Sequence, residues 1–357
     1  MSKILVTGGT GYIGSHTVVE LQQAGHEVVI VDNLSNSSIE VLDQVAAITG
    51  KKPKFEKTDL RDREATLGIF RKHLNLDAVI HFAALKAVGE SVDLPLEYYR
   101  NNLNALINML EGMQVYCVKS LVFSSSCTVY GEPDQLPVTE ESPVKKANSP
   151  YGNTKQIAEQ IMQDFRVPHP EIRYISLRYF NPIGAHPSAL IGELPSGIPN
   201  NLVPFITQTA AGVREELKVF GDDYNTPDGS AIRDYINVVD LSRAHVVAIE
   251  RMIGEENDSG FEVFNLGTGK GVSVFEMIKA FEKATGQSLN YKVTGRREGD
   301  VEQVFADTSL ANKVLGWKAG VPLEDSLRSA AETVGFAAAG NGPRFGGTPT
   351  IRYRLEP

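Results

Sequence analysis

Five short apolar segments in the first 126 residues alternate with stretches that have the apolar spacing of helices. These segments are KILVT (3–7), EVVIVD (27–32), KFEKTD (54–59), DAVIHFA (77–83) and SLVFSSS (120–126). They lack a strict alternation of apolar and polar side chains, which is typical of strands that are covered on both faces. Strands that alternate with helices predict an α/β fold with a doubly wound parallel sheet.

A glycine-rich loop follows the first predicted strand and opens a helix. In VTGGTGYIGSH (6–16), Gly8, Gly11 and Gly14 are spaced three residues apart. Glycines at these places let the backbone turn tightly and approach a diphosphate at the positive end of the helix. A purely structural turn is the alternative. The position between a strand and a helix favours a dinucleotide site on a Rossmann-like sheet.

The second predicted strand ends in VDNLSNS (31–37), where Asp32 lies 18 residues after Gly14. A carboxylate at this distance accepts hydrogen bonds from the ribose hydroxyls of an adenosine. Its charge would repel a 2′-phosphate and no arginine follows closely, so we expect NAD rather than NADP. Asp59 has two interpretations that the sequence does not separate: it binds the adenine amino group, or it caps the helix that follows.

The segment SPYGNTK (149–155) places Tyr151 one helical turn before Lys155. For this spacing alone, an exposed helix turn is the simpler interpretation. However, SSSCTVYG (124–131) ends the fifth strand at the carboxyl edge of the sheet, where ligands bind. With oxidised nicotinamide bound, its charge and that of Lys155 would favour the phenolate and lower the pKa of Tyr151. Tyr151 would then accept a hydroxyl proton, with a serine from 124–126 bonded to the same oxygen.

The composition of the 357-residue chain narrows the classes of partner. A hydrophobic share of 42% with 22% charged residues is ordinary for a globular protein, and the net charge of −9 argues against nucleic acid or an anionic membrane surface. The two cysteines, Cys117 and Cys127, lack metal-ligand spacing. No apolar run approaches the ~20 residues of a membrane span. We therefore expect a reduced, cytoplasmic protein without a metal site.

The character of the chain changes after about residue 180. Residues 181–201 are rich in proline and glycine and predict long structured loops, whereas 234–252 and 261–269 predict a helix and a strand that return to the sheet. Residues 272–286 predict a helix that Gly286 closes. We expect an NAD-binding domain at 1–180 and 234–267, a smaller C-terminal α/β substrate domain at 181–233 and 268–336, and a mobile tail at 337–357.

Two predicted helices carry apolar faces. One face steps by three or four residues through Leu96, Tyr99, Leu103, Leu106, Leu110 and Met113, and the other consists of Ile157, Ile161 and Phe165. Packing in the core is the simpler interpretation for most of these positions. Part of the two faces could instead form the seam of a symmetric dimer.

Several segments taken together resemble the UDP-glucose 4-epimerases of the extended short-chain dehydrogenase/reductase family. The resemblance runs from residue 3 to about 330 and is carried by GGTGYIGSH, VDNLSNS, HFAALKAVGES, SSSCTVYGE, SPYGNTK, RYFNPIGAHPS, GIPNNLVPFI, RDYINVVDL and RREGD. It implies a reversible 4′-epimerisation of UDP-glucose and UDP-galactose in galactose metabolism. The implied route passes through a transient 4-keto sugar and bound NADH, in a homodimer.

The resemblance also assigns roles to single residues. Tyr151 is the implied base, Lys155 holds the nicotinamide ribose, and Ser126 shuttles the proton. The implied NAD site comprises Gly8, Gly11, Tyr12, Ile13, Gly14, Asp32, Asn33, Leu34, Ser35, Asn36, Ser37, Asp59, Leu60, Phe82, Ala83, Ala84, Leu85, Lys86, Asn101, Ser126, Tyr151, Lys155 and Phe180. The implied UDP-sugar site comprises Ser126, Tyr151, Asn181, Asn201, Leu202, Lys218, Val219, Phe220, Arg233, Arg297, Asp300 and Val304.

The residue that matches Val304 varies in size in this family. A valine leaves space beside the 2′ position of the sugar, so we also expect activity on UDP-N-acetylglucosamine and UDP-N-acetylgalactosamine. The alternative is that Val304 packs against a neighbour that refills the space. Cys127 stands where a small residue is usual and is interpreted as a packing residue rather than a reactive thiol.

Two other functions compete with the epimerase. A nucleotide-sugar 4,6-dehydratase needs an acidic pair beside Ser126, where this chain has Cys127 and Thr128. A non-catalytic NAD sensor would be expected to lose Tyr151, Lys155 or Ser126, and all three are present. The chain departs from the family after residue 330, where ETVGFAAAGNGPRFGG replaces an aromatic-rich helix. This departure concerns the terminal packing and not the site.

Overall fold

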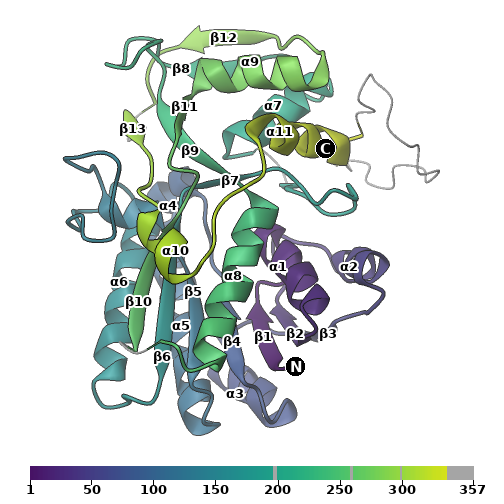
Figure 1. The fold of residues 1–357 in the computed structure, drawn as a ribbon, viewed down its shortest axis with the longest axis vertical. Coiled ribbons are helices and arrows are strands. Elements are labelled where there is room, and N and C mark those ends of the chain that lie inside the picture. The colour runs from purple at the N-terminus through teal and green to yellow at the C-terminus, as the bar shows by residue number, and fades with distance from the viewer. Residues whose placement is uncertain (196–198, 258–259, 298–299, 336–357) are drawn as a thin grey trace.

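A seven-stranded parallel sheet forms the centre of the larger lobe in the computed structural model, which describes residues 1–195, 199–257, 260–297 and 300–335 (Figure 1). The strand order is β10-β6-β5-β4-β1-β2-β3. Its strands are β1 (Lys3–Thr7), β2 (Glu27–Asp32), β3 (Lys54–Lys57), β4 (Ala78–His81), β5 (Ser120–Ser126), β6 (Arg173–Tyr179) and β10 (Phe261–Leu266). All five strands predicted in the first 126 residues are present, so the predicted doubly wound sheet is confirmed.

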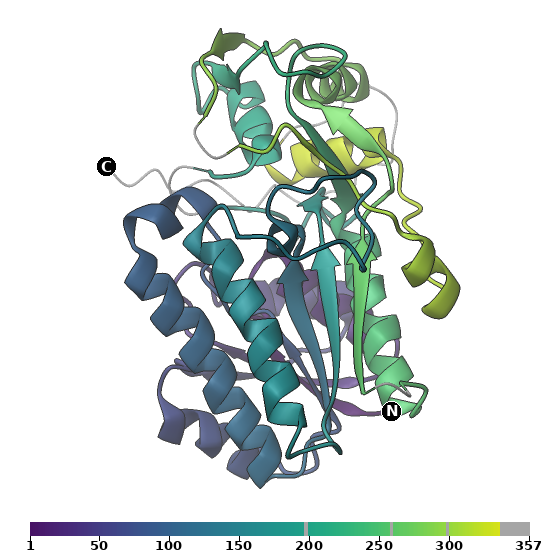
Figure 2. The same ribbon diagram turned by 90° about the vertical axis from the view of Figure 1, so that its left-hand side faces the viewer.

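Helices cover both faces of this sheet. One face carries α1 (Tyr12–Gln23), α2 (Val41–Thr49) and α8 (Val238–Ile253); the other carries α3 (Arg63–Lys72), α5 (Pro95–Val115) and α6 (Pro150–Arg166), with the short α4 (Val88–Asp93) before α5 (Figures 1 and 2). Successive residues of β1 enter different cores, because Ile4 and Val6 pack under one layer and Leu5 under the other. Burial on both faces explains why the strands lack alternation.

The smaller lobe lies over the carboxyl edge of the large sheet (Figures 1 and 2). Its sheets comprise β7 (Asn181–Ile183), β9 (Ile232–Asn237), β11 (Gly271–Ser273) and β13 (Gln303–Val304), and separately β8 (Leu217–Phe220) and β12 (Tyr291–Thr294). Its helices are α7 (Leu202–Ala210), α9 (Val274–Thr285) and α11 (Leu323–Thr333), which share a core around Ile206, Phe281 and Leu327. Two short helices, η1 (Cys127–Tyr130) and α10 (Ser309–Val314), complete the described elements.

The chain crosses between the lobes more than once. After β9 in the smaller lobe it returns through α8 and β10 to the large sheet, as predicted for 234–252 and 261–269, although 234–237 still belong to β9. The predicted helix at 272–286 is α9, and Gly286 ends it in the left-handed conformation at φ +73°. The proposed division into two domains stays a prediction, and the predicted tail at 337–357 lies outside the described residues.

Helix α5 departs from its predicted apolar face. Leu106, Leu110 and Met113 are buried in the core, but Leu96 is 67% exposed. The core-facing side of the first turns is formed instead by Tyr98 and Ala105. The predicted face therefore divides between the core and the surface.

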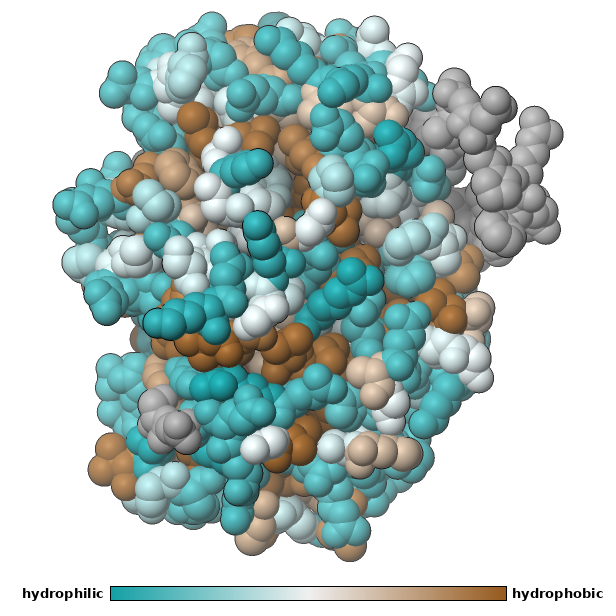
Figure 3. All heavy atoms as spheres, viewed as in Figure 1, coloured by the Kyte–Doolittle hydropathy of each residue, from teal (hydrophilic) through white to brown (hydrophobic). Residues whose placement is uncertain are grey.

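The face of the molecule that Figure 3 shows is mostly hydrophilic, with apolar side chains in limited patches. No helix in the described part of the chain is long and apolar enough to span a membrane. Among the same residues, no cluster of His, Cys, Asp or Glu has the arrangement of a metal site.

Candidate active site

The glycine-rich loop between β1 and α1 is shaped by close backbone contacts. Gly8 has φ +68°, and a Cβ there would lie 2.8 Å from the backbone nitrogen of Ala83. A Cβ on Gly14 would collide with the carbonyl group of Gly8. Gly11 is the N-cap residue of α1 and has no side chain to bond the first helical N–H groups. The loop therefore presents free N–H groups and a close backbone approach, which fit a diphosphate.

Asp32 ends β2 beside this loop and is buried. Its Oδ1 accepts hydrogen bonds from the Leu34 nitrogen at 2.9 Å and the Ser37 hydroxyl at 3.2 Å, and its Oδ2 lies 3.3 Å from the Thr10 nitrogen. These bonds fix the carboxylate at the end of its strand. The position and charge fit an acceptor for ribose hydroxyls.

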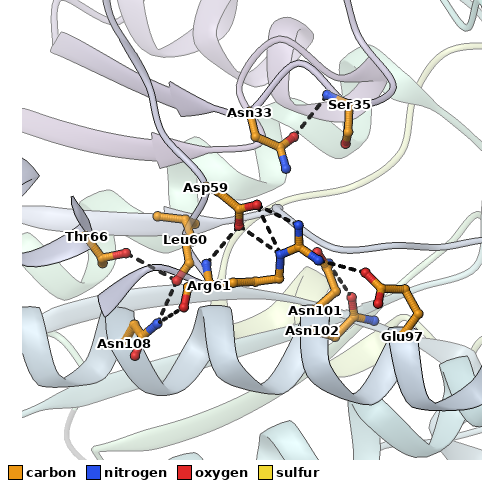
Figure 4. Close-up of polar contacts among 10 residues, drawn as sticks. All are labelled: Asn33, Ser35, Asp59, Leu60, Arg61, Thr66, Glu97, Asn101, Asn102 and Asn108. Carbon is orange, nitrogen blue, oxygen red and sulfur yellow. Dashed lines mark hydrogen bonds and ion pairs between the residues drawn. The ribbon is translucent and has the colours of Figure 1, made fainter. Parts of the chain in front are cut away.

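Asp59 follows β3 in the same corner of the molecule, near Asn33 and Asn101 (Figure 4). It does not cap α3, because the side chain of Asp62 accepts from the Ala65 nitrogen at 3.0 Å. The helix-cap interpretation of Asp59 is therefore wrong. Hydrogen bonds with Arg61, the shortest at 2.7 Å, hold the pKa of Asp59 below its usual value. Binding of adenine by Asp59 stays a prediction.

The other predicted cofactor residues gather at the carboxyl edge because they directly follow strands of the large sheet. Tyr12 and Ile13 begin α1 after β1, residues 33–37 follow β2, Leu60 follows β3, residues 82–86 follow β4, and Phe180 follows β6. The carboxyl ends of parallel strands share one edge, so this clustering follows from the topology.

The loop after β4 is held by a residue that the sequence analysis missed. The Asn102 side chain accepts from the Leu85 nitrogen at 2.8 Å and donates to the Leu85 carbonyl at 3.0 Å and the Thr154 hydroxyl at 3.1 Å. It thereby ties this loop and α5 to α6. Asn102 follows the predicted cofactor residue Asn101, but one sequence does not reveal which of two adjacent asparagines faces inward.

Tyr151 and Lys155 lie one turn apart at the start of α6, beside Ser126 at the end of β5. The Ser149 side chain caps α6 by accepting from the Gly152 nitrogen at 3.2 Å. Lys155 is 4% exposed, and its Nζ donates to the Ser124 carbonyl at 2.6 Å. Helix α6 and β5 thus bring together the three predicted catalytic residues.

The protein alone does not lower the pKa of Tyr151. Burial raises it to about 12, and a hydrogen bond with Ser126 opposes the rise. Burial also lowers the pKa of Lys155 to about 7, against the attraction of Glu159. The sequence predicts the phenolate only with a bound, oxidised nicotinamide. The raised pKa of Tyr151 and the lowered pKa of Lys155 agree with this condition, because a second positive charge is needed to ionise Tyr151.

Cys127 packs rather than reacts. It lies with Val304 and Phe180 in an apolar cluster, and burial raises the pKa of its thiol to about 12. Val304 is 8% exposed and pairs with Arg233 between β13 and β9. The structure therefore places Val304 near both Cys127, the neighbour of Ser126, and an arginine of the predicted UDP-sugar site.

Two arginines of that site converge on one carboxylate. Arg297 donates to Asp300 at 2.6 and 3.1 Å, and the Arg233 guanidinium lies 3.9 Å from the same side chain. The Arg297 guanidinium also lies 5.6 Å from the centre of the Phe220 ring. Charged groups for a diphosphate, a carboxylate for hydroxyls and an exposed ring for a base thus meet in one place.

The remaining predicted substrate residues divide into two groups. Asn181, Asn201 and Leu202 line a shared pocket with Tyr235. On β8, Lys218 is exposed, whereas the Val219 side chain is buried in the core of the smaller lobe. The Val219 side chain therefore does not line the pocket.

A carboxylate that the sequence analysis did not predict joins the two sites. Glu193 Oε1 accepts from Lys86 Nζ at 3.1 Å and from Asn201 Nδ2 at 2.7 Å. Lys86 belongs to the predicted NAD site and Asn201 to the predicted UDP-sugar site. A glutamate in a proline- and glycine-rich loop gives no sequence signal for this contact.

Comparison with known proteins now identifies the family. Residues 4–267 match the model of the NAD dependent epimerase/dehydratase family. The chain belongs to this family. It is 53% identical to a UDP-glucose 4-epimerase of Bacillus subtilis over 90% of this chain and 94% of that protein, and 50% identical to the mouse UDP-glucose 4-epimerase over 91% and 94%.

A solved structure extends the likeness to the fold over most of the chain. The UDP-glucose 4-epimerase of Bifidobacterium longum, in complex with NAD+ and UDP, is 48% identical, with a TM-score of 0.89 over 93% of this chain and 98% of that one. The resemblance stated from the sequence motifs is therefore confirmed, as is the Rossmann-like fold. NAD as the predicted cofactor agrees with the family and with this neighbour.

Proposed function

We propose that the chain catalyses the reversible 4′-epimerisation of UDP-glucose and UDP-galactose with tightly held NAD. The observation that carries this proposal is the meeting of Ser126, Tyr151 and Lys155 at the carboxyl edge, between the glycine-rich loop and the Arg297–Asp300 corner. A proton acceptor, a dinucleotide cradle and charged groups for a nucleotide diphosphate are the parts that this reaction needs. The named relatives, about 50% identical over most of the chain, support the same activity.

The residues fit NAD. A Cβ would fill the cradle at Gly8 and Gly14, so only a glycine loop leaves room for a diphosphate there. Asp32 is fixed as an acceptor for the adenosine ribose and would repel a 2′-phosphate. When bound, NAD would serve as the acceptor of the hydride that leaves C4′ of the sugar and, once reduced, as the donor of the hydride that returns to it.

The acid–base work belongs to the chain. Tyr151 would accept the proton of the 4′-hydroxyl, with Ser126 bonded between the phenol and the sugar oxygen. Lys155, anchored on the Ser124 carbonyl, would stabilise the phenolate electrostatically. The same Tyr151 would return the proton when the opposite face of the transient 4-keto sugar is reduced, so the cycle has no net redox change.

The nucleotide would stay anchored while the keto sugar turns over. Arg233 and Arg297 suit the diphosphate, Asp300 the uridine ribose and Phe220 the uracil ring. Asn181 and Asn201 supply amide groups at the wall of the neighbouring pocket. Holding the nucleotide at one end leaves the sugar free to present either face.

N-acetylated sugars extend the proposed substrate range. Val304 lies near Cys127, and a valine lacks the phenol ring that would wall off the space beside the 2′ position of the sugar. A UDP-Glc/GlcNAc 4-epimerase of Campylobacter jejuni is 37% identical to this chain, with a TM-score of 0.80 over 93% of this chain and 99% of that one. We propose that UDP-N-acetylglucosamine and UDP-N-acetylgalactosamine are interconverted as well.

A homodimer and a cytoplasmic location complete the proposal, together with a role in galactose metabolism. The direct experiment is to supply UDP-galactose to the purified protein without added NAD and to measure the UDP-glucose that forms.

A further inference from the structure

A buried glutamate that has no role in the proposed reaction lies one helical turn beyond Lys155. Glu159 is 4% exposed on α6. Its Oε1 accepts from the Ser125 hydroxyl at 2.6 Å. Arg178 on β6 bonds both of its oxygens, with Nε at 3.0 Å and Nη2 at 2.5 Å. A buried carboxylate of this kind needs such partners, because removal from water penalises its charge.

These partners form a row across three strands. Ser125 on β5 is paired with Arg178 on β6, and Arg178 is paired with Asn265 on β10. Arg178 Nη1 also donates to the Tyr130 hydroxyl at 3.0 Å, and that hydroxyl donates to Asn265 Oδ1 at 2.7 Å. The network therefore holds the chain on both sides of Ser126: at Ser125 before it and at Tyr130 after it.

We propose that Glu159 is a positioning residue which, through Ser125 and Arg178, fixes the end of β5 that carries Ser126 against the turn of α6 that carries Tyr151 and Lys155. The inference rests on the proposed epimerase function and deepens it. Glu159 touches neither sugar nor cofactor in this account. It acts by keeping the three groups at the distances that proton transfer requires.

The charge of Glu159 adds a second effect, on Lys155. Burial lowers the pKa of Lys155 to about 7, and the negative charge of Glu159 acts in the opposite direction. The other titratable or charged groups around this corner include Tyr151 on the same helix, His81 on β4, Cys127 and Tyr130 on η1, and Arg178 and Tyr179 on β6.

Between about pH 5 and 9 these neighbours, apart from Tyr151, keep their charges. Burial lowers the pKa of His81 to about 3 and raises that of Tyr130 to about 12. Burial also raises the pKa of Tyr179, and Glu159 raises that of Arg178, so the phenol stays neutral and the guanidinium charged. Tyr151 must be deprotonated to act as the base, so its ionisation belongs to the acidic limb of the pH profile. A change in the alkaline limb then reports on Lys155.

The test compares four variants by kcat, KM and pH profile for UDP-galactose, with retained NAD measured in each preparation. Glu159→Gln should lower kcat on the order of 10-fold to 100-fold with little change in KM, because misplaced reacting groups lose rate rather than binding. Its alkaline limb should move to lower pH by about one unit, since the loss of the negative charge lowers the pKa of Lys155.

Two milder variants separate position from charge. Ser125→Ala removes the link to β5 but keeps the carboxylate, so kcat should fall several-fold while the alkaline limb stays in place. Glu159→Asp keeps the charge on a shorter side chain, so its limb should also stay in place while kcat falls. Glu262→Gln is the matched control, because Glu262 on β10 forms a similar part-buried pair with Arg251 on α8, at 2.9 Å.

The outcomes are distinct. If wild-type protein does not convert UDP-galactose, the proposed function itself is refuted. If wild type is active and Ser125→Ala has wild-type kcat, the positioning role of Glu159 is overturned. This result also decides the case in which Glu159→Gln does not fold because Arg178 has lost its counter-ion. A Glu159→Gln enzyme that matches Glu262→Gln in kcat and pH profile overturns it as well.

Discussion

The pKa of Tyr151 shows what the protein contributes to the chemistry of the site without the cofactor. Burial opposes ionisation of the phenol, and the bond with Ser126 offsets it only in part. The site thus holds a protonated tyrosine until a further positive charge arrives. Coupling the base to a bound, oxidised cofactor would keep Tyr151 inactive in its absence.

Replacement of the hydroxyl tests this role. Tyr151→Phe should lower kcat by ~10²–10⁴-fold, because a positioned acid–base group is lost. The ring that packs in the site remains, so retained NAD and the affinity for UDP should stay close to wild type. Turnover above half of the wild-type rate would remove Tyr151 from the mechanism.

The size of one side chain should decide the sugar range. Val304 is almost buried, so a larger residue there must extend into the space beside it. Val304→Tyr should abolish turnover of UDP-N-acetylgalactosamine and leave that of UDP-galactose within a few-fold, measured on the same preparation. Failure of the wild type to turn over the acetylated sugar, under conditions where UDP-galactose reacts, would refute the proposed role of Val304 in the sugar range.

At the scale of elements, α5 and α6 run side by side on the outside of the larger lobe (Figure 2). Leu96 is 67% and Ile107 40% exposed on α5, and Leu103 between them is only partly buried. Their spacing of seven and four residues places them on one face. On α6, Ile161 and Phe165 are likewise partly buried. An apolar surface of this kind is a candidate for contact with a second copy.

We therefore predict a symmetric dimer through α5 and α6. Sedimentation at micromolar concentration should show a dimer for wild type, and Ile107→Glu should weaken it by at least ~10-fold in Kd, because a charge would lie in an apolar seam. Val167→Glu, at an exposed valine just past the end of α6, is the control and should remain dimeric. A stable wild-type monomer would contradict the prediction.

For the whole molecule, local signals and long-range contacts differ in how well the sequence reveals them. The sheet was predictable because β1 and β5 are short, apolar and bounded by turns or helices, and the glycine loop fixes where the first crossover begins. The contacts of Glu159 with Arg178 and of Glu193 with Lys86 were not. The first joins two different elements 19 positions apart and the second joins loops 107 positions apart. A lone glutamate on a helix or loop is usually solvated.

The same limit applies to Asp59 and to α5. Asp59 and Asp62 both precede α3, and only the structure shows that Asp62 makes the cap. The apolar period of α5 was visible, but the side of the helix that faces the core depends on the crossing of α3 and α6. One-dimensional spacing contains no such information.

Three buried histidines should make the whole fold sensitive to acid. Burial lowers the pKa of His16 and His245 to about 4 and that of His81 to about 3. Between these values and the unfolded pKa of about 6.5, the unfolded chain binds more protons. The free energy of unfolding therefore falls as pH drops below about 6.5, by ~1.4 kcal/mol per pH unit for each histidine.

Urea unfolding between pH 7 and 5 measures this slope. His245→Phe replaces one titrating ring between Phe82 and Tyr179. The dependence of the free energy of unfolding on pH should then decrease by up to ~1.4 kcal/mol per pH unit. An unchanged slope would show that His245 does not contribute.

The most direct test of the account is a single conversion. Purified protein is given UDP-galactose with no added NAD, and the nucleotide sugars are separated and quantified over time. The account predicts that UDP-glucose forms over many turnovers per protein molecule and that the same mixture is reached from UDP-glucose, because the cofactor is held and regenerated within each cycle. Absence of UDP-glucose from protein that carries NAD, or a dehydrated sugar as the product, would contradict it.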